Sequence, residues 1–421
     1  MEVDAWLPRA AAAHPHRSAL GTLDYAGLLA AAQRTARRLA ARGASRGDRV
    51  ALVLPAGEEF AVALHACLLL GAVAVPIDPR LPADERAARS AGCVLTVDGE
   101  VTGEEDPGVA LTAVHDLEAP AVIVHTSGTT AGARPVTLTY GNWLWSALGS
   151  AVTLGSDPEE RWLCCLPVAH VGGLSILIRS VIAGTTAVLH EGFDTDRVLA
   201  ALRDPAGPTL VSLVPATLTR LLDAGLREPP ALRWVLLGGA AIPDALLERA
   251  RAAGVPVAPT YGMTEACSQI LTNGAPLFCT RVTIGADGEI LVSGPTVSPT
   301  AGPVLHTGDL GRIEPDGTVA VLGRADDVII SGGENVAPQA VEAVLERHPA
   351  VLEAGAHART DERFGQVVVA TVVLREGAAV TADELLEHCR GALAPWEVPK
   401  AITFAASLPR TASGKLLRRE L

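Results

Sequence analysis

The sequence predicts an α/β fold in two parts: a large N-terminal domain of parallel or mixed sheets with flanking helices, and a small α+β C-terminal domain. Two observations lead to this prediction. Helix-like and strand-like apolar segments alternate along much of the chain, and from about residue 289 short strands joined by turns replace them. With 421 residues, the chain is long enough for more than one domain.

The alternation begins with a helical pattern that ends at Gly43. Helices are expected at residues 25–42, 58–70 and 82–90, and strands at 49–54, 72–77 and 93–97. Residues 98–117 are acidic and weakly patterned, so we expect a surface excursion there.

The same rhythm resumes in the second half. Strands are expected at residues 209–214, 234–237, 255–259, 289–292, 311–314, 319–322 and 367–374, and helices at 215–224, 242–253, 338–347 and 382–392. A new unit begins beyond Asp326. We therefore expect one domain over residues 1–324 and a second over residues 325–421.

The composition limits the classes of function. Hydrophobic residues make up 49% of the chain, which excludes wholesale disorder, and the net charge of −13 argues against a nucleic-acid partner. The seven cysteines include no CxxC pair, which favours free thiols in a reducing cytosol. The N-terminus has no basic leader pattern and both long apolar stretches are interrupted, so we expect a cytoplasmic protein without a membrane span.

A loop rich in hydroxyls and glycine follows the apolar run 121–124. It contains Thr126, Ser127, Gly128, Thr129 and Thr130, and Arg134 follows it. Glycine allows close backbone approach, and N–H and O–H groups can surround an anion, so this composition suits a phosphate. No Gly-Lys-Ser/Thr closes it as in a Walker loop, and taken alone it also fits a polar surface loop.

Further motifs stand where expected strands end. Gly238, Gly239 and Ala240 follow one strand, and Tyr261, Gly262, Met263, Thr264 and Glu265 follow the next. Open α/β sheets bind ligands at this edge. Asp309 lies in a glycine-flanked turn, Arg324 and the Gly332-Gly333 pair come later, and Lys415 stands near the end of the chain.

This order of motifs resembles the adenylate-forming superfamily of acyl-CoA synthetases, luciferases and peptide-synthetase adenylation domains, over almost the whole chain. The resemblance implies the adenylate-forming fold with a mobile C-terminal domain, and ATP, Mg²⁺ and CoA as cofactor and co-substrates. The ATP phosphates would be held by Thr126, Ser127, Gly128, Thr129, Thr130 and Arg134. The rest of the nucleotide would contact Gly238, Gly239, Ala240, Tyr261, Gly262, Asp309 and Arg324.

The resemblance also implies catalytic roles. Thr264 would bind the α-phosphate, Glu265 would bind Mg²⁺, and Lys415 would neutralise charge as the carboxylate attacks. Because Lys415 is needed only in the first step, the small domain would rotate between steps about Asp326. Gly332 and Gly333 would then face the CoA channel.

The acyl site is expected around His170, Arg179 and Ser212. Arg179 is a single cation in an apolar run, so it either pairs with an acidic side chain or serves an acid with a second carboxylate. These segments resemble most the 2-succinylbenzoate–CoA ligases of menaquinone biosynthesis. Another aryl- or acyl-CoA ligase, a carrier-loading adenylation enzyme and an inactive ligand-binding homologue are the alternatives. The expected partners are a small carboxylic acid, ATP and CoA, with a homodimer left open.

The phosphate loop departs from the family pattern. Ala131, Arg134 and Pro135 stand where the family usually has Gly, Lys and Gly. Arginine still supplies charge, but Ala131 restricts the backbone and Pro135 removes an N–H. We therefore expect slower or weaker use of ATP, not its loss.

Overall fold

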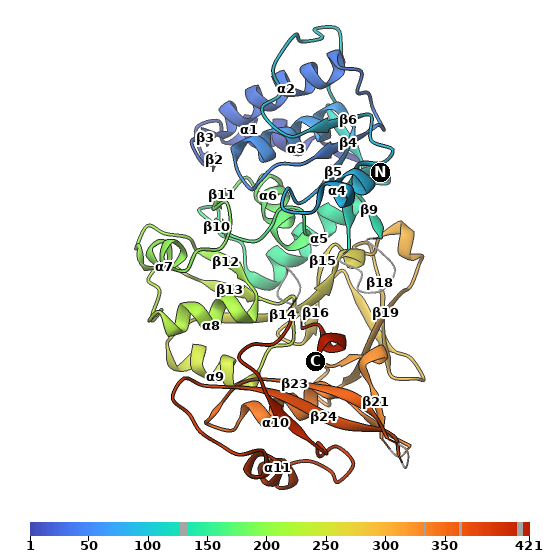
Figure 1. Ribbon diagram of the computed structural model, residues 1–421. Helices are drawn as coiled ribbons and strands as arrows, with labels where there is room; N and C mark the ends of the chain where they lie inside the picture. Colours follow the sequence, from blue (N-terminus) through green and yellow to red (C-terminus); the bar gives the residue numbers. More distant parts are fainter. Residues whose placement is uncertain (127–133, 332, 362–363, 411–415) are drawn as a thin grey trace.

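The structure is a computed structural model that describes residues 1–126, 134–331, 333–361, 364–410 and 416–421. Two mixed sheets form the core of the N-terminal part (Figure 1). The larger has the order β16-β15-β14-β13-β12-β10-β11-β2-β3 and the smaller the order β6-β4-β5-β8-β9. Most neighbours in both are parallel, and antiparallel pairs occur at β14–β15 and β8–β9, as expected for this α/β domain.

The strands of the larger sheet are β2 (Ser18–Leu20), β3 (Leu23–Asp24), β10 (Arg161–Cys164), β11 (Thr186–Leu189), β12 (Leu210–Leu213), β13 (Trp234–Leu237), β14 (Val257–Met263), β15 (Ser268–Thr272) and β16 (Ala275–Pro276). Those of the smaller sheet are β4 (Arg49–Leu52), β5 (Val73–Pro76), β6 (Leu95–Val97), β8 (Pro120–His125) and β9 (Pro135–Thr139). A separate short pair joins β1 (Glu2–Asp4) to β7 (Val114–Asp116).

Helices cover these sheets. They are α1 (Trp6–Ala13), α2 (Tyr25–Ala41), α3 (Glu58–Leu70), α4 (Ala83–Ser90), α5 (Tyr140–Leu154), α6 (Val171–Ala183), α7 (Thr195–Arg203), α8 (Pro215–Asp223) and α9 (Asp244–Ala252). One hydrophobic cluster runs through α2, α3, α5 and α6, with Trp143 and Leu64 fully buried in it. The two interrupted apolar stretches, residues 61–77 and 174–189, are therefore buried helices that end at Gly71 and Gly184 and lead into strands, of which β5 is buried and β11 is partly exposed.

Two further sheets follow. The first has the order β17-β18-β19-β20, with β17 (Arg281–Ile284), β18 (Glu289–Ser293), β19 (Leu305–Ile313) and β20 (Val319–Arg324). The last contains β21 (Ile329–Ser331), β22 (Glu334–Val336), β23 (Val351–Asp361), β24 (Gly365–Leu374) and β25 (Ile402–Phe404), with α10 (Pro338–Glu346) and α11 (Ala382–Arg390).

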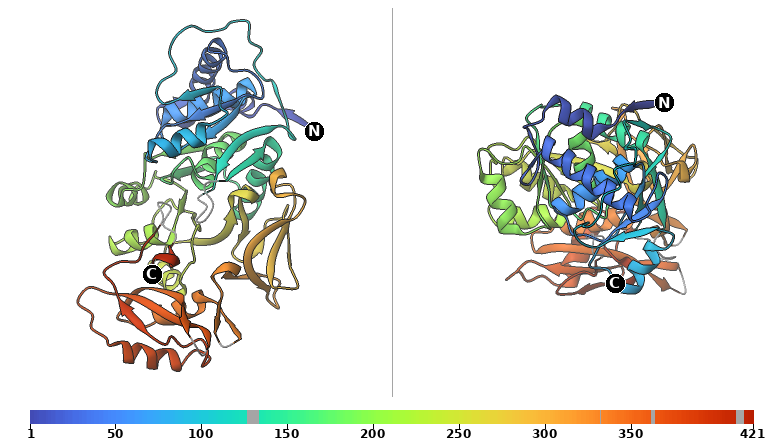
Figure 2. Two further views of the ribbon diagram at one scale, coloured as in Figure 1. Left: turned by 45° about the vertical axis from the view of Figure 1, so that its right-hand side comes forward. Right: turned by 90° about the horizontal axis from the view of Figure 1, so that it is seen from above.

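This last unit has a hydrophobic cluster of its own, built on residues such as Val341, Val372 and Leu385. It lies at one end of an elongated molecule, and the final residues of the chain turn back toward the N-terminal part (Figure 2). The proposed boundary at residues 324 and 325 coincides with the end of β20. A short 3₁₀ turn, η3 (Ala325–Asp327), follows directly.

Two expectations about strand bounds are wrong: residues 261–263 were expected after a strand, and Asp309 in a turn. Tyr261-Gly262-Met263 lies within β14, and Asp309 lies within β19, not in a glycine-flanked turn. In both strands the register shifts beside a glycine, between Tyr261 and Gly262 and between Leu310 and Gly311. These glycines mark β-bulges, which bend a strand without ending it.

Candidate active site

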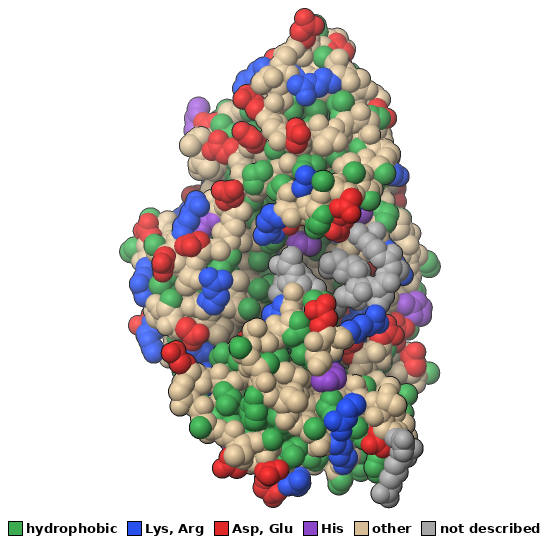
Figure 3. All heavy atoms as spheres, viewed as in Figure 1, with side chains coloured by type: hydrophobic (Ala, Val, Ile, Leu, Met, Phe, Trp, Pro, Cys, Tyr) green, Lys and Arg blue, Asp and Glu red, His purple; other side chains and the backbone are tan. Residues whose placement is uncertain are grey.

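A cavity of about 1350 Å³ lies where several strands of the N-terminal part end. Its wall includes Thr126 after β8, Ser212 in β12, Gly238 after β13 and Thr264 after β14. Residues Leu416–Glu420 of the chain end line it from the other side. Figure 3 shows the hollow on this face, between the N-terminal and C-terminal parts. The motifs that the sequence placed at strand ends therefore meet around one cavity.

The two ends of the phosphate loop are held together. Thr126 donates from its backbone N–H to the Arg134 carbonyl at 3.0 Å, and both residues line the cavity. Antiparallel pairing continues below them through His125 and Pro135. Ser127, Gly128, Thr129, Thr130 and Ala131 lie outside the described residues. The structure thus fixes where the loop starts and ends, at the rim of the cavity.

The glycines on the cavity wall are required by close backbone packing. A Cβ on Gly238 would lie 2.7 Å from the carbonyl oxygen and Cγ2 of Thr260, which leaves no room for a side chain. Gly239 has a φ of 81°, a conformation that favours glycine. A Cβ on Gly262 would collide with the Ser268 carbonyl. Gly238, Gly239 and Gly262 line the cavity, whereas Ala240 does not.

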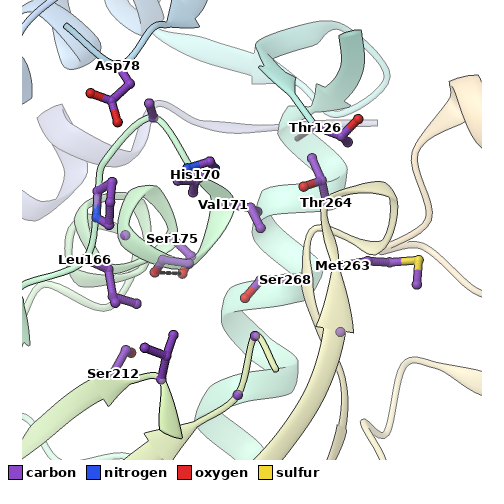
Figure 4. A pocket seen from close by; sticks show the side chains of 18 of the residues that line it. Asp78, Thr126, Leu166, His170, Val171, Ser175, Ser212, Met263, Thr264 and Ser268 are labelled. Carbon is purple, nitrogen blue, oxygen red and sulfur yellow. Dashed lines mark hydrogen bonds between the residues drawn. The ribbon is translucent and has the colours of Figure 1, made fainter. Parts of the chain in front are cut away.

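Thr264 and Glu265 belong to a 3₁₀ turn, η1 (Thr264–Ala266), that continues from β14 into the cavity wall. Figure 4 shows Thr264 and Thr126 next to each other among the residues that line the cavity. Among the described residues, no group of three or more His, Cys, Asp or Glu side chains could hold a metal ion. A magnesium ion bound by Glu265 would therefore take most of its ligands from phosphate oxygens and water, which suits this hard cation.

Tyr261, Asp309 and Arg324 form a hydrogen-bonded group beside the cavity. The Tyr261 hydroxyl donates to Asp309 Oδ2 at 2.7 Å, and Arg324 Nη1 donates to the Thr307 carbonyl at 3.0 Å and lies 3.4 Å from Asp309 Oδ1. Burial, and then the Asp309 carboxylate, raises the pKa of Tyr261, so the hydroxyl stays a donor. Arg324 lines the cavity, whereas Tyr261 and Asp309 adjoin residues that line it, such as Gly262 and Gly308.

His170 precedes α6 and faces the cavity together with Asp78 (Figure 4). Burial lowers the pKa of His170, and the Asp78 carboxylate opposes this shift. Asp78 itself forms a bidentate ion pair with Arg80, at 2.9 and 2.6 Å, and both line the cavity. This acidic and basic pair cannot be recognised from the sequence, because Asp78 and Arg80 belong to no motif.

Arg179 does not line the cavity; it lies one layer behind the wall. It is only 3% exposed, and no ion pair joins it to an acidic side chain among the described residues. Instead, Nη1 donates to Gln269 Oε1 and Nη2 donates to Ser146 Oγ, each at 2.8 Å. Burial lowers its pKa to about 10, so Arg179 remains charged near neutral pH.

This cation supports two side chains that do line the cavity. Gln269 is bonded to Arg179 directly. The guanidinium also stacks over Trp162 at 5.6 Å, and Trp162 Nε1 donates to Ser212 Oγ at 3.1 Å. Arg179 and Ser212, which were both expected at the acyl site, thus belong to one buried network. Gln269 and Trp162 were not expected at this site. Both are uncharged, and their contacts with Arg179 and Ser212 become visible only when the distant segments pack together.

The remaining expected residues lie in the C-terminal unit. Asp326 in η3 lines the cavity. Lys415 lies outside the described residues, and Leu416, the next residue, lines the cavity. Gly333 lies in the turn between β21 and β22, away from the cavity wall, and Gly332 lies outside the described residues.

The expectations about membrane helices and cysteines can be compared with the structure. No helix in the described ranges is long and apolar enough to cross a membrane. All seven cysteines, each of them described, are free thiols.

Comparison with known proteins defines the class. The AMP-binding enzyme family matches residues 7–102 and 90–300, and the AMP-binding enzyme C-terminal domain matches residues 340–415. The chain therefore belongs to the AMP-binding enzyme family. Among curated proteins it is similar to 2-succinylbenzoate–CoA ligase of Bacillus subtilis, with 38% identity over 99% of this chain and 97% of that protein.

Solved structures of a Bacillus subtilis relative agree. The chain is similar to o-succinylbenzoate CoA synthetase in complex with the acyl-adenylate intermediate OSB-AMP, with a TM-score of 0.90 and 37% identity, covering 100% of this chain and 98% of that one. A double mutant of the same relative, bound with its product analogue OSB-NCoA, gives a TM-score of 0.73 at the same identity and coverage. The arrangement of this chain is thus nearer to the adenylate-bound form.

Proposed function

We propose that this protein is an AMP-forming acid–CoA ligase that converts 2-succinylbenzoate to its CoA thioester. In the first step the substrate carboxylate attacks the α-phosphorus of ATP, which gives an acyl-adenylate and pyrophosphate. In the second step the thiol of CoA attacks the acyl carbonyl and AMP leaves. The observation that carries the proposal is one cavity that joins the nucleotide motifs to an acyl end, where a buried cation, Arg179, has no acidic partner among the described residues.

The nucleotide end supplies positioning and charge. We propose that Thr126 and Arg134 hold the phosphates and that Thr264 binds the α-phosphate. We also propose that Asp309 accepts hydrogen bonds from the ribose hydroxyls and that Arg324 assists there. Glu265 would hold Mg²⁺, which neutralises phosphate charge when bound. Relatives have been solved with ATP and magnesium ion, which supports this assignment.

The acyl end supplies selectivity. We propose that His170 contacts the reacting carboxylate region and that Ser212 and Gln269 contact the rest of the acid. Arg179 acts from behind the wall: its charge, with no acidic partner among the described residues, favours an acid with a second carboxylate.

The C-terminal tail supplies the last group. Lysine occurs at only two of the 34 basic positions, Lys400 and Lys415, so almost every other cationic role is given to arginine. The compact ammonium of a lysine and the planar fork of an arginine are not interchangeable. This supports Lys415 as the group that neutralises the attacking carboxylate and the α-phosphate. Rotation about Asp326 between steps would then bring Gly332 and Gly333 to the CoA channel.

The test is ATP–pyrophosphate exchange across a panel of aromatic and dicarboxylic acids. Exchange with 2-succinylbenzoate, followed by CoA thioester formation, is expected. Exchange only with a monocarboxylate contradicts the substrate, and thioester formation only on a carrier protein contradicts the acceptor. A protein that exchanges with no acid is a binding homologue. A cytoplasmic location and a homodimer remain predictions, which fractionation and light scattering would check.

A further inference from the structure

A buried arginine ties the C-terminal tail to two other elements. Arg418 Nη2 donates to Glu342 Oε1 at 2.9 Å and Oε2 at 2.7 Å, and Nη1 donates to Asp327 Oδ2 at 3.1 Å. The side chains of Arg418 and Glu342 are 13% and 10% exposed. Arg418 begins a 3₁₀ turn, η4 (Arg418–Glu420), while Glu342 belongs to α10 and Asp327 to η3.

Glu342 depends on Arg418 for its charge compensation because its carboxylate is buried. Its carboxylate also accepts the Ala356 N–H at 2.8 Å. Burial raises the pKa of Glu342, and Arg418 is the largest opposing influence. A buried carboxylate without its cation is strongly unfavourable. The position of the tail in which the Arg418 guanidinium reaches both Glu342 and Asp327 is therefore stabilised.

The other flank of the tail is held in the same way. Arg410 Nη2 lies 2.9 Å from Glu353 Oε2, on β23. Arg410 and Leu416 form an antiparallel bridge, and the Leu417 N–H donates to the Pro409 carbonyl at 2.9 Å. The segment between them lies outside the described residues. The residues on either side of it are nevertheless fixed to the C-terminal unit, Arg410 to Glu353 on β23 and Arg418 to Glu342 on α10.

The hydrogen bonds of Arg418 connect the tail to the segment at the proposed hinge, through Asp327. Asp327 follows Asp326, the proposed hinge, and both line the cavity together with Leu416 and Leu417. Arg418 therefore links the part of the tail that faces the nucleotide end to the segment that leaves the N-terminal part. The ends of this link are 91 residues apart in the sequence.

We propose that Arg418 is a positioning residue for the adenylation step, because it makes the tail and the hinge-flanking turn move as one body. The tail then enters and leaves the cavity with the whole C-terminal unit and does not swing alone. The inference rests on the proposed function. It predicts that loss of Arg418 harms the step that needs the tail in the cavity and spares the step that does not.

The test measures the two half-reactions separately. In Arg418→Ala, kcat for pyrophosphate exchange should fall about 10- to 100-fold, since misplacement by about 1 Å costs that much. Thioester formation from supplied acyl-adenylate and CoA should stay within about 2-fold of wild type. Arg418→Lys should recover part of the loss, because a lysine can pair with one of the two acids.

Two further variants complete the experiment. Asp327→Asn removes only the hinge side of the link and keeps the volume, so it should give a smaller loss with the same split, and it decides the matter if Arg418→Ala does not fold. Arg390→Ala removes an exposed arginine on α11, whose one ion pair among the described residues is with Glu387, and should change neither step. Equal losses in both half-reactions, or no loss in either, overturn the proposal.

Failure of the proposed function is distinguishable from failure of this inference. If wild type exchanges with another acid but not with 2-succinylbenzoate, the substrate is wrong and the Arg418 test proceeds with that acid. If wild type exchanges with no acid, both are overturned.

Discussion

The Tyr261 hydroxyl lies 2.7 Å from Asp309 Oδ2 and joins two strands that belong to different sheets. Tyr261 is on β14 and Asp309 on β19, and both flank β-bulges. The bond fixes the carboxylate that we assign to the ribose.

Tyr261→Phe should therefore raise KM for ATP about 10-fold, as expected for loss of a hydrogen bond to a charged group. The kcat and the KM for the acid should change little, because the acyl end is untouched. Steady-state kinetics with each substrate varied in turn provide the measurement. An unchanged KM for ATP would show that Asp309 does not depend on Tyr261.

Gly238→Ala should damage nucleotide binding, since the new Cβ would meet Thr260 at 2.7 Å. We expect weaker binding of ATP and a lower melting temperature, both read by thermal shift with and without nucleotide. The matched control is Gly57→Ala. Its backbone is extended, with a φ of 175°, and a Cβ there meets nothing within 4 Å. If both variants behave alike, close packing at Gly238 is not the cause.

Lys415→Ala should cripple pyrophosphate exchange yet leave thioester formation from supplied acyl-adenylate largely intact. The physical reason is that the charge is needed only while the carboxylate attacks phosphorus. Lys415→Arg should recover little, because the bulkier planar group does not replace an ammonium between two oxygens. Equal loss of both half-reactions would contradict rotation of the C-terminal unit.

Arg179→Ala should raise KM for a dicarboxylate far more than KM for ATP. Because Arg179 acts through Gln269 and Ser146, stability should fall as well. Gln269→Leu separates the two effects: it keeps the cation and removes the side chain at the wall. The KM values for 2-succinylbenzoate and for a monocarboxylate analogue, measured in each variant, show the selectivity. If both acids lose equally in Arg179→Ala, the role of Arg179 is stability alone.

Mild acid should destabilise the fold through two buried histidines. Burial lowers the pKa of His65 and of His115 to about 4, below the usual 6.5. Since the folded state favours the neutral rings, stability is full above pH 6.5 and falls as the pH drops toward 4. Each ring accounts for up to about 3 kcal/mol of the change.

Urea unfolding at a series of pH values checks this prediction. The slope of the free energy of unfolding against pH should flatten between 6.5 and 4 in His65→Gln. His16→Gln serves as a control, because His16 is largely exposed and its side chain gains little from the fold. An unaltered slope in His65→Gln would mean that other groups dominate the acid response.

Most regular elements could be predicted from periodicity. The helix at Glu58–Leu70 and the strand at Trp234–Leu237 have the predicted bounds. The strands β14 and β19 could not be bounded, because their glycines resemble turn signals and become bulges only when a neighbouring strand pairs across them. Helix α5 and strand β23 were not identified at all.

The sequence by itself determined the class of chemistry. Residues that contact phosphate, ribose and magnesium must be of particular types in a particular order, and each short motif keeps that information locally. Only the tertiary structure decided that Arg179 is buried with neutral partners beside the cavity, that Tyr261 holds Asp309, and that Arg418 joins the tail to Asp327. The reason is physical: burial and charge pairing depend on which distant segments pack together, and periodicity along the chain does not record it.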